Sequence, residues 1–210
     1  MLKITRFYKE DNLLFFLMPH WSESLRQLTF TFAPMEEDAW QAFLQPWTEV
    51  RFKRKELITR TGETEKYLYF ILDGVQRAFY AGKDKEPTLV FSYAPSFSGI
   101  LDSFLTRQPS LYHLEALTAT HCMRMHYNDF AAFRSAHPSV ERWLAQALTQ
   151  VLAGTLERQV ELLAFSAEEK FTALLSRSPH ILNLIPHKYL ASYIGVDPAT
   201  FSKMLGSVRL

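Results

Sequence analysis

Residues 186–205 read PHKYLASYIGVDPATFSKML, and this stretch indicates the fold more strongly than any other part of the chain. Its apolar residues recur at helical spacing on both sides of a turn: Leu190, Ala191, Ile194, Phe201 and Met204. Gly195 suits the turn because glycine accepts backbone conformations that other residues avoid. Asp197 and Pro198 then supply an N-cap and a preorganised first residue for a second helix. The stretch therefore predicts a helix-turn-helix, with an ordinary helical hairpin as the alternative.

The second helix of this motif is expected to turn three polar side chains toward solvent, namely Thr200, Ser202 and Lys203. Hydroxyl and ammonium groups at these positions suit the phosphates and base edges of a DNA major groove. Lys188, on the preceding helix, is expected to add a contact to the phosphate backbone. From Ser166 onward the chain carries five Lys and Arg against three Asp and Glu. Because this basic excess is small, we expect useful affinity to need two copies of the motif.

A long amphipathic helix is expected before the motif, from just after Pro138 to about Leu163. Its apolar side chains repeat at intervals of three and four residues: Val140, Leu144, Leu148, Val151, Leu152, Leu156, Val160 and Leu163. Such a stripe needs a partner, either the chain's own β-roll or, as we favour, the same helix of a second copy. The expected dimer interface comprises Leu144, Leu148, Val151, Leu152 and Thr155. Ser166 and Glu169 then form a capping-box pattern, so a new helix should begin there.

Residues 50–125 change to a pattern of short apolar and β-branched runs separated by turn signals. Asp73 and Gly74 lie between two such runs and predict a tight type I′ hairpin. Several short strands at regular spacing indicate an antiparallel roll or barrel. Residues 22–45 are expected to be helical around a break at Pro34. The predicted class is α+β, with an N-terminal antiparallel β-roll of the jelly-roll kind, flanking helices, the long helix and the helix-turn-helix.

Composition narrows the class of protein further. A hydrophobic fraction of 48% is enough for a packed core, and a formal charge of +1 means that attraction to nucleic acid must come from local clusters. Cys122 can form neither an internal disulfide nor a Cys-rich metal site, fits a reducing compartment, and is expected to be buried. The early apolar run at 13–18 is too short to span a membrane, and Glu10 and Asp11 interrupt any signal-peptide pattern. We expect a cytoplasmic protein without a membrane segment.

The order of these features resembles the family of bacterial regulators that includes the cyclic-AMP receptor protein and the oxygen-responsive FNR proteins. The resemblance runs from about Trp21 to Leu205. It rests on residues 67–77 (YLYFILDGVQR), 97–104 (FSGILDSF) and 114–117 (LEAL), the long helix, residues 166–170 (SAEEK) and the helix-turn-helix. It implies a jelly-roll sensor that closes around a small ligand, a dimer along the long helix, and DNA half-sites related by two-fold symmetry.

The resemblance also implies a division into three regions. Residues 1–137 would form a cyclic-nucleotide-binding-like sensor domain, 138–165 the dimerisation helix, and 166–210 a helix-turn-helix DNA-binding domain that lacks a complete wing. Lys203 stands where better-known members place a base-reading Arg, and the first turn of its helix carries Pro198 and Ala199 in place of long polar residues. Sequence readout is therefore expected to be relaxed or different.

The sensor region departs from the cyclic-nucleotide-binding members of the family. Those members have a Glu after the cassette Gly and an Arg-Ser or Arg-Thr pair for the cyclic phosphate, whereas here Ile100 follows Gly99 and Ser110-Leu111 stands near the position of the pair. A buried phosphate would have no guanidinium partner, which is costly. The resemblance assigns effector binding to Phe97, Ser98, Gly99, Ile100, Leu101, Asp102, Ser103, Ser110, Leu111 and Tyr112. The sequence favours a different or less charged effector, or none, over cyclic AMP, and its one cysteine cannot ligate an FNR-type iron–sulfur cluster.

Catalysis has little support in the sequence, which shows no phosphate loop and no Ser/His/Asp or paired acid/base pattern. His113, His121 and His126 fall in strand regions, but without a His-x-His pair we expect no metal site and no enzyme. We expect a dimeric DNA-binding transcription regulator with no certain cofactor. Its expected partners are double-stranded DNA and a second copy, with RNA polymerase as a further candidate and no membrane. The alternative is a sensor or protein-interaction module of the same fold without productive DNA binding.

Overall fold

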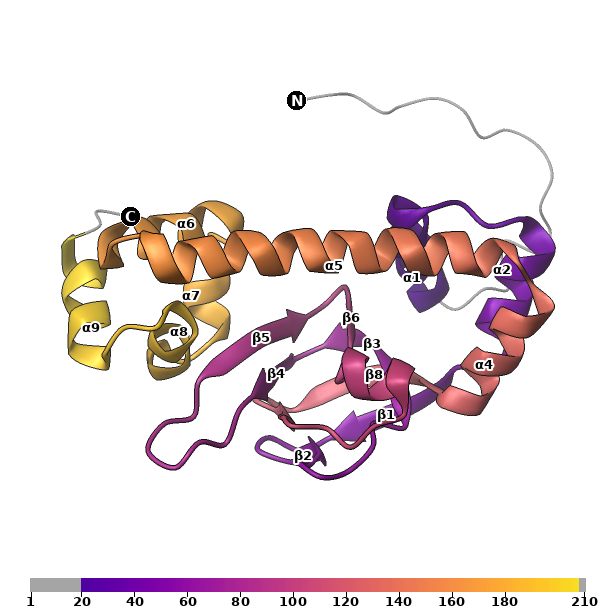
Figure 1. Ribbon diagram of the computed structural model, residues 1–210, viewed down its shortest axis with the longest axis horizontal. Coiled ribbons are helices and arrows are strands. Elements are labelled where there is room, and N and C mark those ends of the chain that lie inside the picture. Colours follow the sequence, from indigo (N-terminus) through magenta and orange to yellow (C-terminus); the bar gives the residue numbers. More distant parts are fainter. Residues whose placement is uncertain (1–19, 208–210) are drawn as a thin grey trace.

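The computed structural model describes residues 20–207, so the features noted in residues 1–19 lie outside it. A jelly roll lies beneath one long helix, α5, and smaller helices gather at both ends of that helix (Figure 1). The strands are β1 (Thr48–Phe52), β2 (Leu57–Thr59), β3 (Tyr67–Asp73), β4 (Val75–Phe79), β5 (Thr88–Tyr93), β6 (Ser96–Ser98), β7 (His113–Ala116) and β8 (Thr120–His126). The helices are α1 (His20–Phe32), α2 (Glu37–Leu44), α3 (Leu101–Thr106), α4 (Tyr127–Ala136), α5 (Ser139–Ala164), α6 (Ala167–Arg177), α7 (Ile181–Leu184), α8 (His187–Ile194) and α9 (Pro198–Ser207).

Two antiparallel sheets of four strands each form the roll. Their strand orders are β1-β8-β3-β6 and β2-β7-β4-β5. The predicted α+β class with an antiparallel roll is confirmed, as are the helices on either side of Pro34. The tightest pairing joins β3 to β8, where Tyr67 lies opposite His126 and Ile71 opposite Cys122.

The hairpin predicted at Asp73 and Gly74 is wrong. Strand β3 pairs with β6 and β8, whereas β4 pairs with β5 and β7, so the chain crosses from one sheet to the other at this point. A type I′ turn needs positive φ at both central residues. Only Gly74 has it, with φ of +87°. A Cβ on Gly74 would lie 2.3 Å from the carbonyl oxygen of Ala119, so the crossing requires glycine.

The alternating side chains of β3 serve two different cores. Leu68 and Phe70 point toward the helices and pack in a cluster that also holds Trp40 of α2 and Trp143 of α5. The indole Nε1 of Trp143 donates to the backbone oxygen of Thr29 at 2.9 Å, which ties α5 to α1. Tyr69 and Ile71 point into the roll and pack with Ala78, Ile100, Leu114 and Cys122. The first third of α5 is therefore fixed to the roll and to α1 by contacts within its own chain.

The C-terminal helices share a third core with the roll. Phe171, Leu174, Leu190, Ile194 and Phe201 are buried together with Val75 and Leu117 of the roll. The capping box predicted at the start of α6 is present, because Ser166 and Glu169 each accept a backbone N–H of the other. Among residues 20–207, no helix combines the length and the apolar character needed to cross a membrane.

Candidate nucleic-acid interface and ligand cavity

Helices α8 and α9 meet at a tight turn whose geometry follows the sequence pattern. Gly195 adopts φ of +67°, and its N–H reaches the backbone oxygens of Ala191 and Ser192 at the end of α8. Asp197 caps α9 by accepting the Thr200 N–H at 2.9 Å and the Thr200 hydroxyl at 2.5 Å. These hydrogen bonds from Thr200 hold the pKa of the Asp197 carboxyl below its ordinary value. The predicted helix-turn-helix is confirmed as a fold.

The three polar side chains predicted to face outward on α9 differ in how free they are. The Thr200 hydroxyl is held by Asp197, and the Ser202 hydroxyl donates to the Pro198 oxygen at 2.9 Å. Lys203 is exposed and forms no ion pair or hydrogen bond within residues 20–207. Lys188 on α8 is also exposed, with Nζ 4.8 Å from the ring centroid of Tyr189. Of the three side chains Thr200, Ser202 and Lys203, only Lys203 has a polar group without a hydrogen bond among the described residues.

A buried ionic cluster docks α8 onto the roll. Arg77 of β4 is 3% exposed, and its Nε lies 2.5 Å from Oε1 of Glu115 on β7. The Arg77 guanidinium also stacks 4.3 Å from the ring centroid of Tyr189 on α8. Lys55 donates to the Tyr189 hydroxyl and lies 3.5 Å from Glu115. Sequence reasoning missed this cluster, because the local pattern of β4 does not show that a distant helix covers it.

Further hydrogen bonds hold α8 and α6 in place. Ser192 of α8 donates to the backbone oxygen of Glu86 at 2.9 Å and accepts the N–H of Thr88 at 3.0 Å, at the start of β5. At the far end of α5, Glu161 is 7% exposed and accepts from Arg177 of α6 and, at 3.1 Å, from Arg158. The Arg177 hydrogen bonds in particular lower the pKa of the Glu161 carboxyl. The helix-turn-helix is thus attached both to α5 and directly to the roll.

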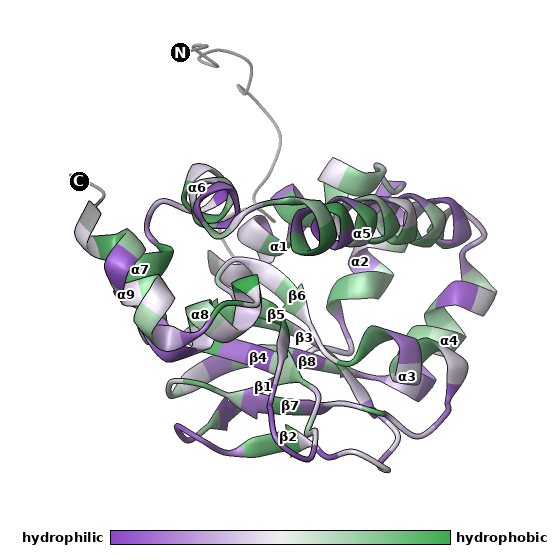
Figure 2. Cartoon of the chain, turned by 60° about the vertical axis from the view of Figure 1, so that its left-hand side comes forward, coloured by the Kyte–Doolittle hydropathy of each residue, from purple (hydrophilic) through white to green (hydrophobic). Residues whose placement is uncertain are grey.

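The second half of α5 presents an apolar surface without a cover among residues 20–207. Its exposed large apolar side chains are Leu148 (37%), Val151 (51%), Leu152 (60%), Leu156 (53%), Val160 (55%), Leu162 (41%) and Leu163 (79%). Figure 2 shows hydrophobic and hydrophilic residues interspersed along α5. Thr155, also exposed, donates to the Val151 oxygen at 2.8 Å. Leu144 requires a correction: it is 8% exposed and packs in its own chain's core, because α5 is still seated on α1 and the roll there.

The segment assigned to effector binding is largely engaged in internal contacts. The Ser98 hydroxyl donates to Gln76 at 2.6 Å, the Ser103 hydroxyl to the Gln108 oxygen at 2.6 Å, and the Ser110 hydroxyl to the Tyr112 oxygen at 2.8 Å. Ile100 is buried in the roll, Phe97 packs on Trp143, and Leu101 lines a small apolar cavity of about 90 Å³ beside α5. Gly99 has φ of +129°, while Asp102 and Leu111 are exposed and Tyr112 is half-buried. The three serine hydroxyls of the segment are therefore engaged within the chain.

A larger cavity of about 510 Å³ opens elsewhere in the roll, and none of the residues assigned to the effector lines it. Its walls are Phe52, Ile58, Thr59, Glu63, Thr64, Glu65, Lys66, Tyr67, Tyr69 and Arg124. Glu65 is 1% exposed, and burial raises the pKa of its carboxyl against the opposing effect of its hydrogen bonds. Sequence reasoning missed this cavity because its walls come from separate strands that carry no contiguous motif.

The histidines in the strands lie apart from one another. His113 accepts the Thr61 N–H at 3.1 Å, His121 lies 2.8 Å from a Glu49 oxygen, and His126 caps α4 by accepting the Asn128 N–H at 3.2 Å. Across residues 20–207, no three His, Cys, Asp or Glu side chains gather in a way that could hold a metal ion.

The β-roll resembles a known domain family. Residues 49–137 match the model of the cyclic nucleotide-binding domain. The match covers 89 of the 210 residues. Within the matched region this chain nevertheless has Ile100, 3% exposed, where the family resemblance places a ribose-binding Glu. Ser110, 2% exposed, stands where an Arg would meet the phosphate. The expectation that cyclic AMP is not the effector stays a prediction.

Solved structures extend the likeness beyond the cyclic nucleotide-binding domain. FixK2 from Bradyrhizobium japonicum is 16% identical with a TM-score of 0.68, covering 76% of this chain and 83% of that chain. The regulator CLP of Xanthomonas campestris is 16% identical with a TM-score of 0.63, covering 81% and 90%. The catabolite activator protein of Thermus thermophilus is 20% identical with a TM-score of 0.54, covering 85% and 89%. The resemblance to the cyclic-AMP receptor protein/FNR family is confirmed at the level of the fold, and no curated protein sequence matches the chain.

Proposed function

We propose that the chain is a cytoplasmic DNA-binding transcription regulator that acts as a homodimer and whose β-roll senses a small molecule. The observation that carries the proposal is a capped helix-turn-helix with an unengaged Lys203, joined to a cyclic nucleotide-binding domain by a helix with an exposed apolar stripe. Regulators of this fold include a protein described as linking cell-cell signalling to virulence gene expression. In the proposal the three regions are 1–137, 138–165 and 166–210, with RNA polymerase as a further partner.

The dimer is supported by the surface of α5. Seven large apolar side chains from Leu148 to Leu163 are each more than a third exposed along one helix. A continuous apolar stripe of this length is unusual on a monomer, and a second copy of the same helix is the partner whose pattern matches it. In the proposal, Leu148, Val151, Leu152 and Thr155 contact the partner, while Leu144 supports them from within its own chain.

DNA contact is assigned to α9, with α8 as a support. Lys203 would reach a base edge or phosphate, Lys188 would contact the backbone, and the oxygens of Thr200 and Ser202 would accept hydrogen bonds because their protons are already donated within the chain. A dimer would bring two copies of Lys188 and Lys203, which gives four phosphate-directed charges. The logarithm of the binding constant should then fall with the logarithm of salt at a slope of about −3.6, or roughly 100-fold between 50 and 200 mM.

A salt titration with genomic promoter fragments tests this proposal. Fluorescence anisotropy should show binding that weakens steeply with salt, and Lys203→Ala should reduce the slope by about 2 because the dimer loses two charges. Lys53→Ala, an exposed lysine at the end of β1, is the matched control and should leave the slope unchanged. Undetectable binding, or a slope that Lys203→Ala does not alter, contradicts the proposal.

The second candidate is a sensor or interaction module that keeps this fold without productive DNA binding. The observation in its favour is that the Thr200 and Ser202 hydroxyls donate within their own chain, which leaves Lys203 as the main reading group. The same titration separates the two, because an interaction module would show no salt-dependent binding to any fragment.

A further inference from the structure

Arg124 of β8 stands out among the charged side chains of the roll. Its Nε is buried without a hydrogen-bond partner, and no carboxylate within residues 20–207 forms an ion pair with its guanidinium. Its guanidinium carbon lies 4.4 Å from the centroid of the Tyr67 ring. A partly buried guanidinium without an anion is costly, so this site is incomplete as it stands.

Glu65, which lines the same cavity as Arg124, is already engaged in hydrogen bonds. Glu65 accepts hydrogen bonds from the Thr59 hydroxyl at 2.7 Å and from the backbone N–H groups of Lys66 at 2.9 Å, Tyr67 at 3.2 Å and Ile100 at 3.3 Å. Four donors saturate its two oxygens. Glu65 therefore stabilises the cavity wall and the start of α3. The donors of the Arg124 guanidinium remain available to a bound ligand.

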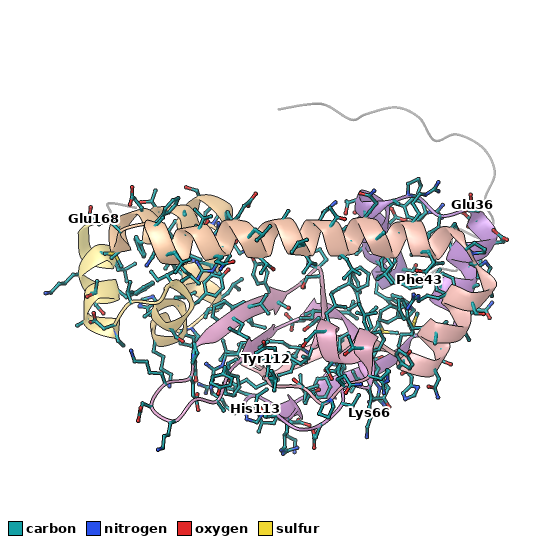
Figure 3. The ribbon with its side chains drawn as sticks, viewed as in Figure 1. Glu36, Phe43, Lys66, Tyr112, His113 and Glu168 are labelled. Carbon is teal, nitrogen blue, oxygen red and sulfur yellow. The ribbon has the colours of Figure 1, made fainter. Side chains whose placement is uncertain are left out.

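The cavity of about 510 Å³ joins these residues to an apolar wall. Phe52, Ile58 and Tyr69 form that wall, and Lys66, labelled in Figure 3 on the side of the roll away from α5, lies at its edge. The volume is within the range of small-molecule sites, which combine apolar walls with a few polar groups. Arg124 offers a planar fork of donors that matches a carboxylate. Glu63 and Glu65 also line the cavity, so a doubly charged phosphate would meet repulsion there.

We propose that this cavity is the effector site of the β-roll and that it binds a small organic acid with one carboxylate and a compact apolar body. The inference rests on the sensing role given under the proposed function. The carboxylate pairs with the Arg124 guanidinium, and the body packs on Phe52, Ile58 and Tyr69. The Ile100 N–H bond to Glu65 connects the occupied wall to α3, whose Leu101 and Leu105 line the small cavity against α5. A change at the cavity wall on ligand binding would thereby be transmitted to α5 through residues that are already in contact.

Isothermal titration calorimetry of the full chain tests the site with three probes: benzoate, phenylacetate and hexanoate. At least one should bind saturably, and its neutral amide and inorganic phosphate should bind at least tenfold more weakly. Arg124→Gln should weaken the carboxylate at least tenfold, and Arg124→Lys should do so by a smaller factor because charge remains but the bidentate fork is lost. Arg142→Gln, an exposed arginine on α5, is the matched control and should stay within twofold of the unmodified chain.

Three outcomes overturn the assignment: no carboxylate binds, the amides bind equally well, or Arg124→Gln leaves binding unchanged. Circular dichroism shows whether each variant is folded. If Arg124→Gln does not fold, the binding measured with Arg124→Lys tests the assignment instead. DNA binding is measured on the same preparations. Intact DNA binding without carboxylate binding refutes the cavity assignment alone, whereas carboxylate binding without DNA binding refutes the regulator proposal alone.

Discussion

Removing Glu115 should destabilise the protein far more than removing Glu86, although both carboxylates pair with the same arginine. Arg77 is 3% exposed, and its Nε lies 2.5 Å from Glu115, whose side chain is 8% exposed, and its Nη2 3.2 Å from Glu86, which is 60% exposed. Breaking a buried pair costs about 3–5 kcal/mol because a charge is left unpaired. Since Glu86 can still reach Arg77, we expect about 2–4 kcal/mol for Glu115→Ala. An exposed pair contributes less than about 1 kcal/mol, so Glu86→Ala should stay below that.

Urea unfolding followed by circular dichroism measures both free energies. The double variant Arg77→Met, Glu115→Leu is the control, because replacing both partners by apolar groups should recover most of the loss. Tyr189→Phe keeps the stacking on Arg77 and removes only the hydroxyl that accepts from Lys55. Equal free energies for the two single alanine variants would refute the argument that burial, rather than the number of ion pairs, sets the stabilisation of this junction.

Three further results are expected. Leu152→Glu places a charge on the exposed apolar stripe of α5 and should weaken self-association at least tenfold in sedimentation equilibrium. If the variant has the same apparent mass as the unmodified chain at every concentration, the stripe is not the dimer interface. Burial raises the pKa of the Cys122 thiol to about 12, so a disulfide exchange reagent at pH 8 should leave it unmodified until denaturant is added, and rapid labelling of the folded chain would contradict this. Hydrogen bonds from Arg177 lower the pKa of Glu161 below 4.5, so its stabilising contribution is present above that value and is lost as the pH falls through the folded-state pKa. Glu161→Gln should flatten this acid-side loss in unfolding experiments between pH 5 and 3, and an unchanged pH dependence would remove Glu161 as its source.

Local patterns predicted the elements well because their causes are local. The capping box at Ser166 and the turn at Gly195 depend on residues within a few positions of one another, and both appear as expected. The prediction of a hairpin at Gly74 failed because the cause of that turn is not local. Its glycine is required by close approach to Ala119, a contact between strands that the neighbouring residues do not encode.

The candidate sites show the same division. Lys203 could be placed on an exposed face from helical periodicity alone, whereas Leu144 obeys the same periodicity and is buried, since periodicity does not say where a helix leaves its own core. No pattern in the sequence marked Arg124 as a binding residue. This residue matters because strand β8 pairs with β3 and brings the guanidinium onto Tyr67, and that pairing is a property of the folded sheet.

The C-terminal helices are attached at two places, to α5 through Glu161 and to the roll through Tyr189 and Ser192 of α8. A body held at one point can pivot gradually, but a body held at two must release one before it can turn. Reorientation of these helices is therefore expected to occur between discrete positions rather than gradually. Changes in the loop between β4 and β5 should shift the balance between these positions, although the loop is part of neither the apolar stripe of α5 nor α9.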